Sequence, residues 1–305
     1  MATPTRKRSD ASPRKKTVSK PSTAAAPAKL ANGNGTSPSN GEVLRQLYFA
    51  LLKCRMVAEY VQRQLPSANY DFAIGHEAVV VATTFRLRAE DTITASGANL
   101  AARVGAAAPL QNSLAQGDTN NSCGSGLGAV VTPASLSNDP FNLGTGVALV
   151  HKVERKGNVV IALCTEESPA LDRWGEALKF AGTHKLPILY VIKSRASDPA
   201  CSGPQNEHLD DFSFMARDYG FPGIIVDGRD VVAVWRVAQE SLHRARNDSG
   251  PTLIDCTMES AKDPLAQMEH YMRKRSVWDD GWKKRISRQI QAEIDAAVAE
   301  PAAKA

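Results

Sequence analysis

Runs of consecutive apolar residues recur along the second half of the chain and predict the strands of a buried sheet. The run from Val159 to Cys164 shows no alternation of apolar and polar positions, which is typical of a strand covered on both faces. The segments LPILYVI, GIIVD and PTLIDCT have the same character. Because none of these strands has a polar face to turn to solvent, they predict a parallel sheet.

Around these runs the apolar residues recur at helical spacing instead. Asp230 stands where its side chain can cap a helix that begins at residue 231. A further helix is expected to carry Leu171, Trp174, Leu178 and Ala181 on one face. The alternation of strands and helices predicts an α/β fold of three layers, a mostly parallel sheet with helices on both faces. The other expected helices cover about 42–65, 76–87, 144–154, 209–219, 231–245 and 279–297.

The segment 104–140 is rich in glycine and small polar residues, has no sustained period and predicts a long loop. Its CGSGLG stretch follows no strand and does not complete a GxGxxG motif, so it does not indicate a dinucleotide site. Gly144 and Gly146 are expected to permit close packing at a helix start. Glu77 is expected to begin a helix, where a carboxylate favours the positive end of the helix dipole.

The net charge of +5 is unevenly distributed along the 305 residues. Residues 1–40 hold eight Lys and Arg against one acid, Asp10, so this part carries +7 and the remainder −2. The composition of residues 1–41 predicts a disordered basic tail, and residues 299–305 a second short tail. A transit peptide would have a similar bias, but the prolines at 4, 13, 21 and 27 oppose the amphipathic helix that it needs. A basic arm that docks on an acidic partner stays open.

The five cysteines are widely spaced and contain no CxxC pair, which predicts free thiols in a reducing compartment, the cytoplasm. The six histidines show no HExxH motif, so no zinc or other metal site is expected from them. No apolar run approaches the length of about 18 residues that a membrane span needs. The remainder of the chain, at −2, gives no reason to expect a nucleic-acid partner.

Eight segments resemble, in order and spacing, the alpha subunit of the thiamine-diphosphate-dependent 2-oxo acid dehydrogenases, the first component of the pyruvate and branched-chain complexes. The resemblance covers about Leu44 to Ala297, so residues 42–298 are expected to form one domain of this kind. The segments are LYFALLKCRMVAEYVQRQL, IGHEAVVVATTFRL, LGTGVALVHK, VVIALC, EALKFAGTHKLPILYVI, YGFPGIIVDGRDVVAVWRVAQESLHRAR, GPTLIDC and MRKRSVWDDGWKKRI.

The resemblance implies a cofactor, thiamine diphosphate, held through magnesium by Gly-Asp-Gly after one strand and Asn-Asn after the next. This chain has Thr165-Glu166-Glu167 in the first place and Ser194-Arg195 in the second. Magnesium prefers oxygen ligands and usually shares them with phosphate. Glu167 brings a negative charge toward an anion, and Arg195 offers a metal no acceptor. Glu166, Glu167, Ser194 and Arg195 are therefore cofactor positions by resemblance that we do not expect to function as such.

Other positions depart from the family pattern in the same direction. Asp71 stands where the family has an active-site histidine, and a loop before Asp263-Pro264 is shortened. The Tyr-Arg pair and the Gly-x-Val stretch of the family correspond to Ser96-Gly97-Ala98 and Ser135-Leu136-Ser137. These changes together predict loss of the cofactor site.

Lys193 and Arg195 arrive at the strand end opposite Glu166 and Glu167, which suggests two interpretations. In one, these charges pair and fill the space of the lost metal and diphosphate, and each cation offsets the desolvation of a carboxylate. In the other, all four side chains point into water and contribute little.

Three functions are consistent with the sequence. The first is a catalytically impaired protein, a pseudoenzyme, that acts as a structural or regulatory partner. The second is an active oxidoreductase that decarboxylates a 2-oxo acid with thiamine diphosphate, magnesium, a lipoyl disulfide acceptor and a beta subunit. The third assigns the function to the basic tail as a nucleic-acid anchor. The resemblance implies a beta subunit as partner, and self-association is the alternative.

Overall fold

The computed structural model describes residues 40–64, 74–95, 100–105, 110, 129–131, 139–165, 174–194, 212–258 and 262–299. The predicted tails lie outside these residues, except for residues 40, 41 and 299, which the prediction wrongly placed in the tails because they belong to the first and last helices. Leu171 and the CGSGLG stretch also lie outside them.

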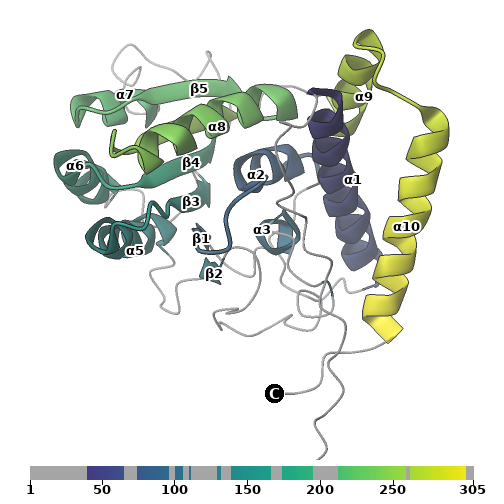
Figure 1. The fold of residues 1–305 in the computed structure, drawn as a ribbon, viewed down its shortest axis with the longest axis horizontal. Coiled ribbons are helices and arrows are strands. Elements are labelled where there is room, and N and C mark those ends of the chain that lie inside the picture. The colour runs from purple at the N-terminus through teal and green to yellow at the C-terminus, as the bar shows by residue number, and fades with distance from the viewer. Residues whose placement is uncertain are drawn as a thin grey trace, which may run out of the picture. The chain divides into compact units, whose positions relative to one another are not determined.

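In the part of the chain that the structure describes, six parallel strands form a single sheet in the order β2-β1-β3-β4-β6-β5 (Figure 1). Every strand pair between them is parallel, which confirms the predicted α/β architecture. The three central strands are almost entirely buried, as their continuous apolar sequences predict. The strands are β1 (Thr92–Ala95), β2 (Ala129–Val131), β3 (Val160–Thr165), β4 (Ile188–Ser194), β5 (Gly223–Asp227) and β6 (Thr252–Thr257).

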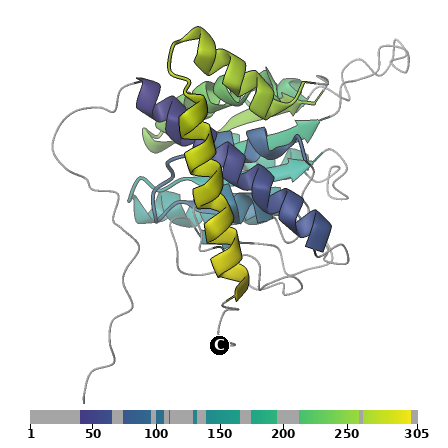
Figure 2. The same cartoon turned by 90° about the vertical axis from the view of Figure 1, so that its right-hand side faces the viewer.

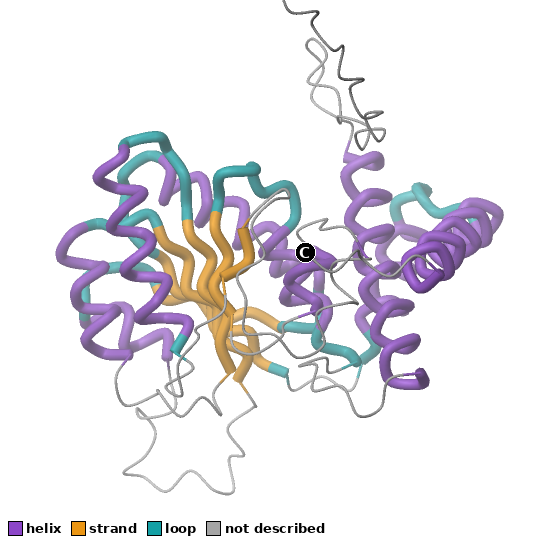
Figure 3. Tube along the Cα trace, turned by 90° about the horizontal axis from the view of Figure 1, so that it is seen from below, coloured by secondary structure: helices purple, strands orange, loops and turns teal. Residues whose placement is uncertain are grey.

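Helices cover both faces of the sheet (Figures 1 and 3). Helices α5 (Pro140–Glu154), α6 (Trp174–His184) and α7 (Phe212–Asp218) form one apolar cluster with one face. Helices α2 (Glu77–Thr84) and α8 (Val231–Arg246) pack on the other. The other helices among the described residues are α1 (Asn40–Gln64), α3 (Leu100–Gly105), α9 (Pro264–Lys274) and α10 (Asp280–Ala299).

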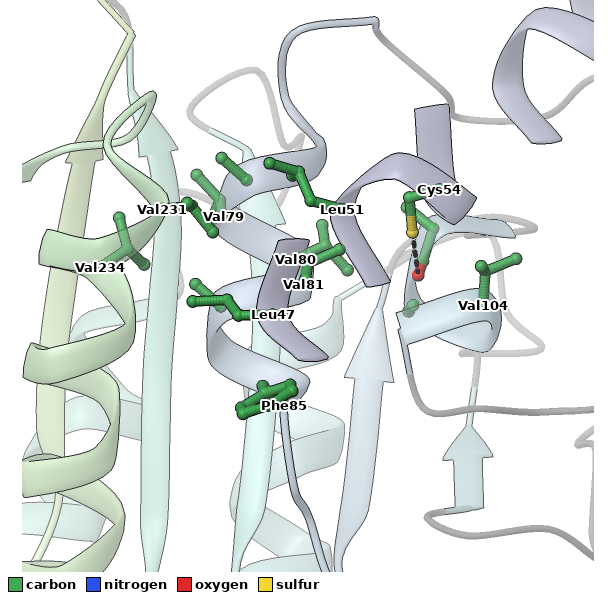
Figure 4. Packing of buried hydrophobic residues seen from close by; sticks show 14 of the residues in the cluster. Leu47, Leu51, Cys54, Val79, Val80, Val81, Phe85, Val104, Val231 and Val234 are labelled. Atoms are coloured by element: carbon green, nitrogen blue, oxygen red, sulfur yellow. Dashed lines mark hydrogen bonds between the residues drawn. The ribbon is translucent and has the colours of Figure 1, made fainter. Parts of the chain in front are cut away.

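Helix α2 is buried between α1 and α8, and its three consecutive valines contact both sides (Figure 4). Leu47 and Leu51 approach it from α1, and Val231 and Val234 from α8. Helix α10 crosses the outer side of α1 (Figure 2). The three predicted layers therefore carry an additional layer of helices, α1, α9 and α10, beyond α2.

Most predicted elements are confirmed to within a few residues, and the exceptions have local causes. The predicted loop at 104–140 contains strand β2, whose three residues are too short to show a period. Strand β1 and helix α3 were not predicted either, since each has only four to six residues. Helix α9 was not predicted at all, and α5 begins at Pro140 rather than Gly144. Both helices start with an Asp cap followed by proline, a signal that a search for apolar periodicity alone does not detect. No helix in the described ranges is long and apolar enough to cross a bilayer.

The two glycines of α5 differ in their surroundings. A Cβ atom at Gly144 would lie 2.8 Å from Thr94 Oγ1 and 3.1 Å from Ala162 Cβ, so close packing on the sheet requires glycine there. A Cβ atom at Gly146 would meet nothing within 4 Å. The close packing predicted for Gly144 is confirmed, and the same prediction for Gly146 is wrong because that residue faces away from the sheet.

A buried ion pair fixes the amino edge of the sheet. Asp91, fully buried just before β1, accepts hydrogen bonds from Arg246 Nη1 at 2.9 Å and Nη2 at 2.5 Å. It also accepts from the backbone N–H groups of Val159 at 3.0 Å and Arg88 at 2.7 Å. The carboxylate thus joins the starts of β1 and β3 to the end of α8 with every charge satisfied.

We expect Arg246→Met to lower the free energy of unfolding by about 3 to 5 kcal/mol, because it leaves the buried Asp91 carboxylate without its cation. Urea unfolding followed by circular dichroism measures the loss. Lys152→Met is the control, since it breaks an exposed ion pair with Asp248 and should change little. Equal effects of the two substitutions would contradict the role given to Asp91.

Candidate functional site

The carboxyl ends of the strands form the candidate site, because parallel strands end at a common edge where α/β proteins bind ligands. Thr165 ends β3 and lies opposite Lys193 of β4. Ser194 ends β4 and lies opposite Thr257 of β6, which also lies opposite Asp227, the last residue of β5. Polar residues from four adjacent strands therefore gather at one edge.

Of the four predicted cofactor positions, the structure describes Ser194 alone. Lys193, the predicted partner of the glutamates, is half-buried beside it. The predicted ion pair stays a prediction, because its other members lie outside the described residues. Those members are Glu166, Glu167 and Arg195, and the same holds for Asp71, Ser96-Gly97-Ala98 and Ser135-Leu136-Ser137.

Ser194 directs its hydroxyl into the sheet, where it donates a hydrogen bond to Oδ1 of Asp255 on β6. Each of the two residues is only 4% exposed. Asp255 lies opposite Ile192, two residues before Ser194, so both polar side chains lie on the sheet face that α5, α6 and α7 cover. A buried carboxylate needs such donors, because burial without them is costly.

Asp255 was missed as a site residue in the sequence. The signal was present, since it is the one acidic residue in the otherwise apolar segment PTLIDCT. Its partner could not be found in the same way, because strand β5 separates β4 from β6 in sequence whereas β6 lies next to β4 in the sheet.

A second polar cluster ties three helices together near this edge. Glu77, the buried first residue of α2, accepts a hydrogen bond from Arg55 Nε at 2.6 Å and from the backbone N–H of Gly75 at 2.5 Å. Arg55 also donates to Asp263, the N-cap of α9, at 2.5 Å. The predicted position of Glu77 at a helix start is confirmed, and its carboxylate additionally holds α1 against α2.

The charges of this cluster shift the ionisation of its arginine. Desolvation lowers the pKa of the Arg55 guanidinium, but its hydrogen bonds and attraction to Asp263 and Glu77 outweigh that effect and the net shift is upward. Arg55 therefore stays charged at neutral pH and connects α1, where it lies, to Glu77 of α2 and to Asp263 at the start of α9.

The thiol of Cys256 lies next to the site on β6 and is fully buried. Burial raises its pKa, and the neighbouring Asp255 raises it further, whereas Lys193 lowers it. Cys54 and Cys164 are also buried free thiols, as predicted, while Cys123 and Cys201 lie outside the described residues. With its thiol buried and protonated, Cys256 does not act as a nucleophile at neutral pH.

The described residues at the strand ends do not fit a magnesium-bound diphosphate. The Ser194 hydroxyl is already committed to Asp255, inside the sheet rather than beyond its edge. Lys193 offers a metal no acceptor, and Thr165 carries a side chain where the resemblance implies glycine. No step that uses such a group can be derived from these residues.

Comparison with known proteins gives a family match. The family model described as "Dehydrogenase E1 component" matches residues 55–259. The chain is 28% identical over 209 residues to the alpha subunit of acetoin:2,6-dichlorophenolindophenol oxidoreductase of Bacillus subtilis (strain 168), covering 65% of this chain and 62% of that protein.

Two further relatives carry dehydrogenase names. The alpha subunit of 2-oxoisovalerate dehydrogenase of Bacillus subtilis (strain 168) is 26% identical over 196 residues, covering 56% of this chain and 59% of that one. The alpha subunit of the pyruvate dehydrogenase E1 component of Staphylococcus aureus (strain Mu50) is 25% identical over 285 residues, covering 84% and 76%. The chain thus spans less than two thirds of the acetoin and 2-oxoisovalerate relatives that it matches.

We expect Ser194→Ala to lower the free energy of unfolding by about 1 to 3 kcal/mol, because it removes a hydrogen-bond donor from a buried carboxylate. Chemical denaturation gives the value. Thr183→Ala is the control, since its exposed hydroxyl donates only to the carbonyl of Lys179 in its own helix. A loss no larger than that of the control would show that the hydroxyl of Ser194 is not needed by Asp255.

We expect Cys256 to resist iodoacetamide in the folded protein from pH 7 to 9, because its raised pKa keeps the thiol protonated throughout this range. Mass spectrometry of the peptide that contains Cys256 measures alkylation before and after unfolding in guanidinium. Labelling of the folded protein that increases through pH 8 at the rate of a free thiol would contradict this assignment.

Proposed function

This chain belongs to the dehydrogenase E1 component family, and on that premise we propose that it is an alpha-subunit-like structural or regulatory partner with impaired cofactor chemistry. Members of the family use thiamine diphosphate, usually with a metal. In this proposal the chain retains the fold of the alpha subunit but has lost the ability to bind the cofactor at the strand ends.

The observation that carries the proposal is the hydrogen bond from Ser194 to Asp255. The resemblance places a magnesium-binding asparagine at this position, the last residue of β4. In this chain the corresponding hydroxyl satisfies a buried carboxylate of the protein itself. The substitutions at Thr165, Glu167 and Arg195 support the proposal by the same chemical reasoning.

The proposed partner is a beta subunit of the same family, with self-association as the alternative. The relatives named above are alpha subunits, a name that implies association with further chains. In the family the cofactor lies between the two subunits, and the beta chain contributes an activating glutamate. An impaired alpha-like chain would bind a beta subunit without completing a functional cofactor site.

An active enzyme is the second candidate, and the extent of the family match favours it. The match to the pyruvate dehydrogenase subunit covers 84% of the chain. In this candidate Glu166 and Ser194 would hold magnesium, and the protein would be an oxidoreductase that transfers the decarboxylated unit of a 2-oxo acid to a lipoyl disulfide.

The proposal assigns this role to residues 42–298, with residues 1–41 and 299–305 as tails and the cytoplasm as the compartment. The basic tail would add an attachment to an acidic partner rather than to nucleic acid or membrane. These assignments are based on the composition of the sequence and on the range of residues that the family model matches.

The test is calorimetric titration of the full chain with thiamine diphosphate and magnesium, alone and with a beta subunit of the family. We expect no saturable heat of binding, because the Ser194 hydroxyl is hydrogen-bonded to Asp255 and Lys193 offers a metal no acceptor. The Staphylococcus aureus subunit with its own beta chain is the positive control. Micromolar binding by the present chain would contradict the proposal and favour the active enzyme.

A further inference from the structure

The turn between β5 and α8 contains a guanidinium that lacks a partner. Arg229 is half-buried, and its Nε atom is buried without a hydrogen bond. Within the described ranges its side chain forms no hydrogen bond or ion pair. This contrasts with Arg55 and Arg246, whose guanidinium groups bind carboxylates.

The backbone of this turn is held firmly. The N–H of Gly228 donates to Thr257 O at 2.8 Å, and the N–H of Arg229 donates to Asp227 Oδ1 at 2.9 Å. A Cβ atom at Gly228 would lie 2.6 Å from Sδ of Met258, the residue after β6, and 3.2 Å from Cβ of Cys256 in β6, so the chain passes very close to this strand. Arg229 therefore projects from a fixed point at the carboxyl edge of the sheet.

The guanidinium lies against Gly75, the residue two positions before Glu77. Gly75 has φ +96°, and a Cβ atom there would lie 2.6 Å from Arg229 Nη1. Only glycine suits this position, both for its backbone conformation and for the space that Arg229 occupies. The Arg229 guanidinium, which projects from the turn after β5, thus packs against the loop that precedes α2.

The acidic residues near Arg229 and Gly75 in the sequence already accept hydrogen bonds from other groups. Glu77 accepts from Arg55 and from Gly75 N. Asp227 accepts from the backbone of Arg229, and Asp230 accepts from the first N–H groups of α8. A half-buried cation without a partner is unfavourable, and an anion from solution would relieve that cost.

We propose that Arg229 binds the carboxylate group of a small monocarboxylic acid at the carboxyl edge of the sheet. A guanidinium presents a planar fork of donors that matches a carboxylate. A single negative charge suits the position, because the Glu77 carboxylate is bound to the N–H of Gly75 and Asp227 and Asp230 flank Arg229 in the chain, and these acids would repel the second charge of a phosphate. The site uses none of the metal and diphosphate positions, so it goes beyond the proposed function and does not depend on it.

The test uses acetate as the probe and the full chain without thiamine diphosphate. The thermal unfolding midpoint is measured against sodium acetate, with sodium chloride at equal ionic strength as reference. Binding to the folded state should raise the midpoint in a saturable manner. We expect Arg229→Met to raise the half-saturating acetate concentration at least about tenfold, as removal of a charge-assisted hydrogen bond does.

Two further variants control for charge and geometry. Arg288→Met, which removes an exposed arginine of α10, should leave the acetate response unchanged. Arg229→Lys should bind acetate more weakly than the wild type, because an ammonium group lacks the planar fork.

The unfolding midpoint without acetate is the second readout. Arg229→Met should leave it unchanged or higher, since the substitution removes an unpaired charge. A midpoint that falls while the acetate response persists would show that Arg229 has an internal partner and would overturn the proposal. So would an absent acetate response in the wild type, or tighter binding of inorganic phosphate than of acetate.

Discussion

The burial of the parallel ladder β3-β4-β6 constrains what happens at its carboxyl edge. Both faces of these strands are covered by helices, so a polar side chain near the strand ends must find its partner inside the protein. Ser194 and Asp255 meet this requirement for each other across β4 and β6. The hydroxyl that would otherwise be available beyond the sheet is thereby directed into it.

The scaffold around this edge is preserved by interactions that do not involve the strand ends. Arg55, Glu77 and Asp263 hold α1, α2 and α9 together, and Asp91 with Arg246 fixes the opposite edge. A fold can persist in this way while the chemistry of its ligand site changes, because packing and ligand binding rest on different residues. Membership of the dehydrogenase E1 component family therefore identifies the architecture more firmly than the activity.

Sequence patterns predicted the long elements well, because continuous apolar strands and amphipathic helices each bury a characteristic face. Strands β1 and β2 and helix α3 were not predicted, since each has only three to six residues. Helix α9 was not predicted because it is marked by its Asp-Pro start rather than by periodicity. Contacts between segments that are distant in the sequence cannot be predicted from local patterns of apolar and polar residues. The bond from Ser194 to Asp255 depends on strand order, and the approach of Arg229 to Gly75 depends on how a turn and a loop meet in space.

A crystal structure grown with thiamine diphosphate and magnesium in excess would test most directly whether Ser194 has been withdrawn from metal binding. The arrangement described above predicts that its hydroxyl remains hydrogen-bonded to Asp255 and that no diphosphate density lies beyond β3 and β4. Density for the cofactor at those strand ends, with Ser194 turned outward to the metal, would contradict it.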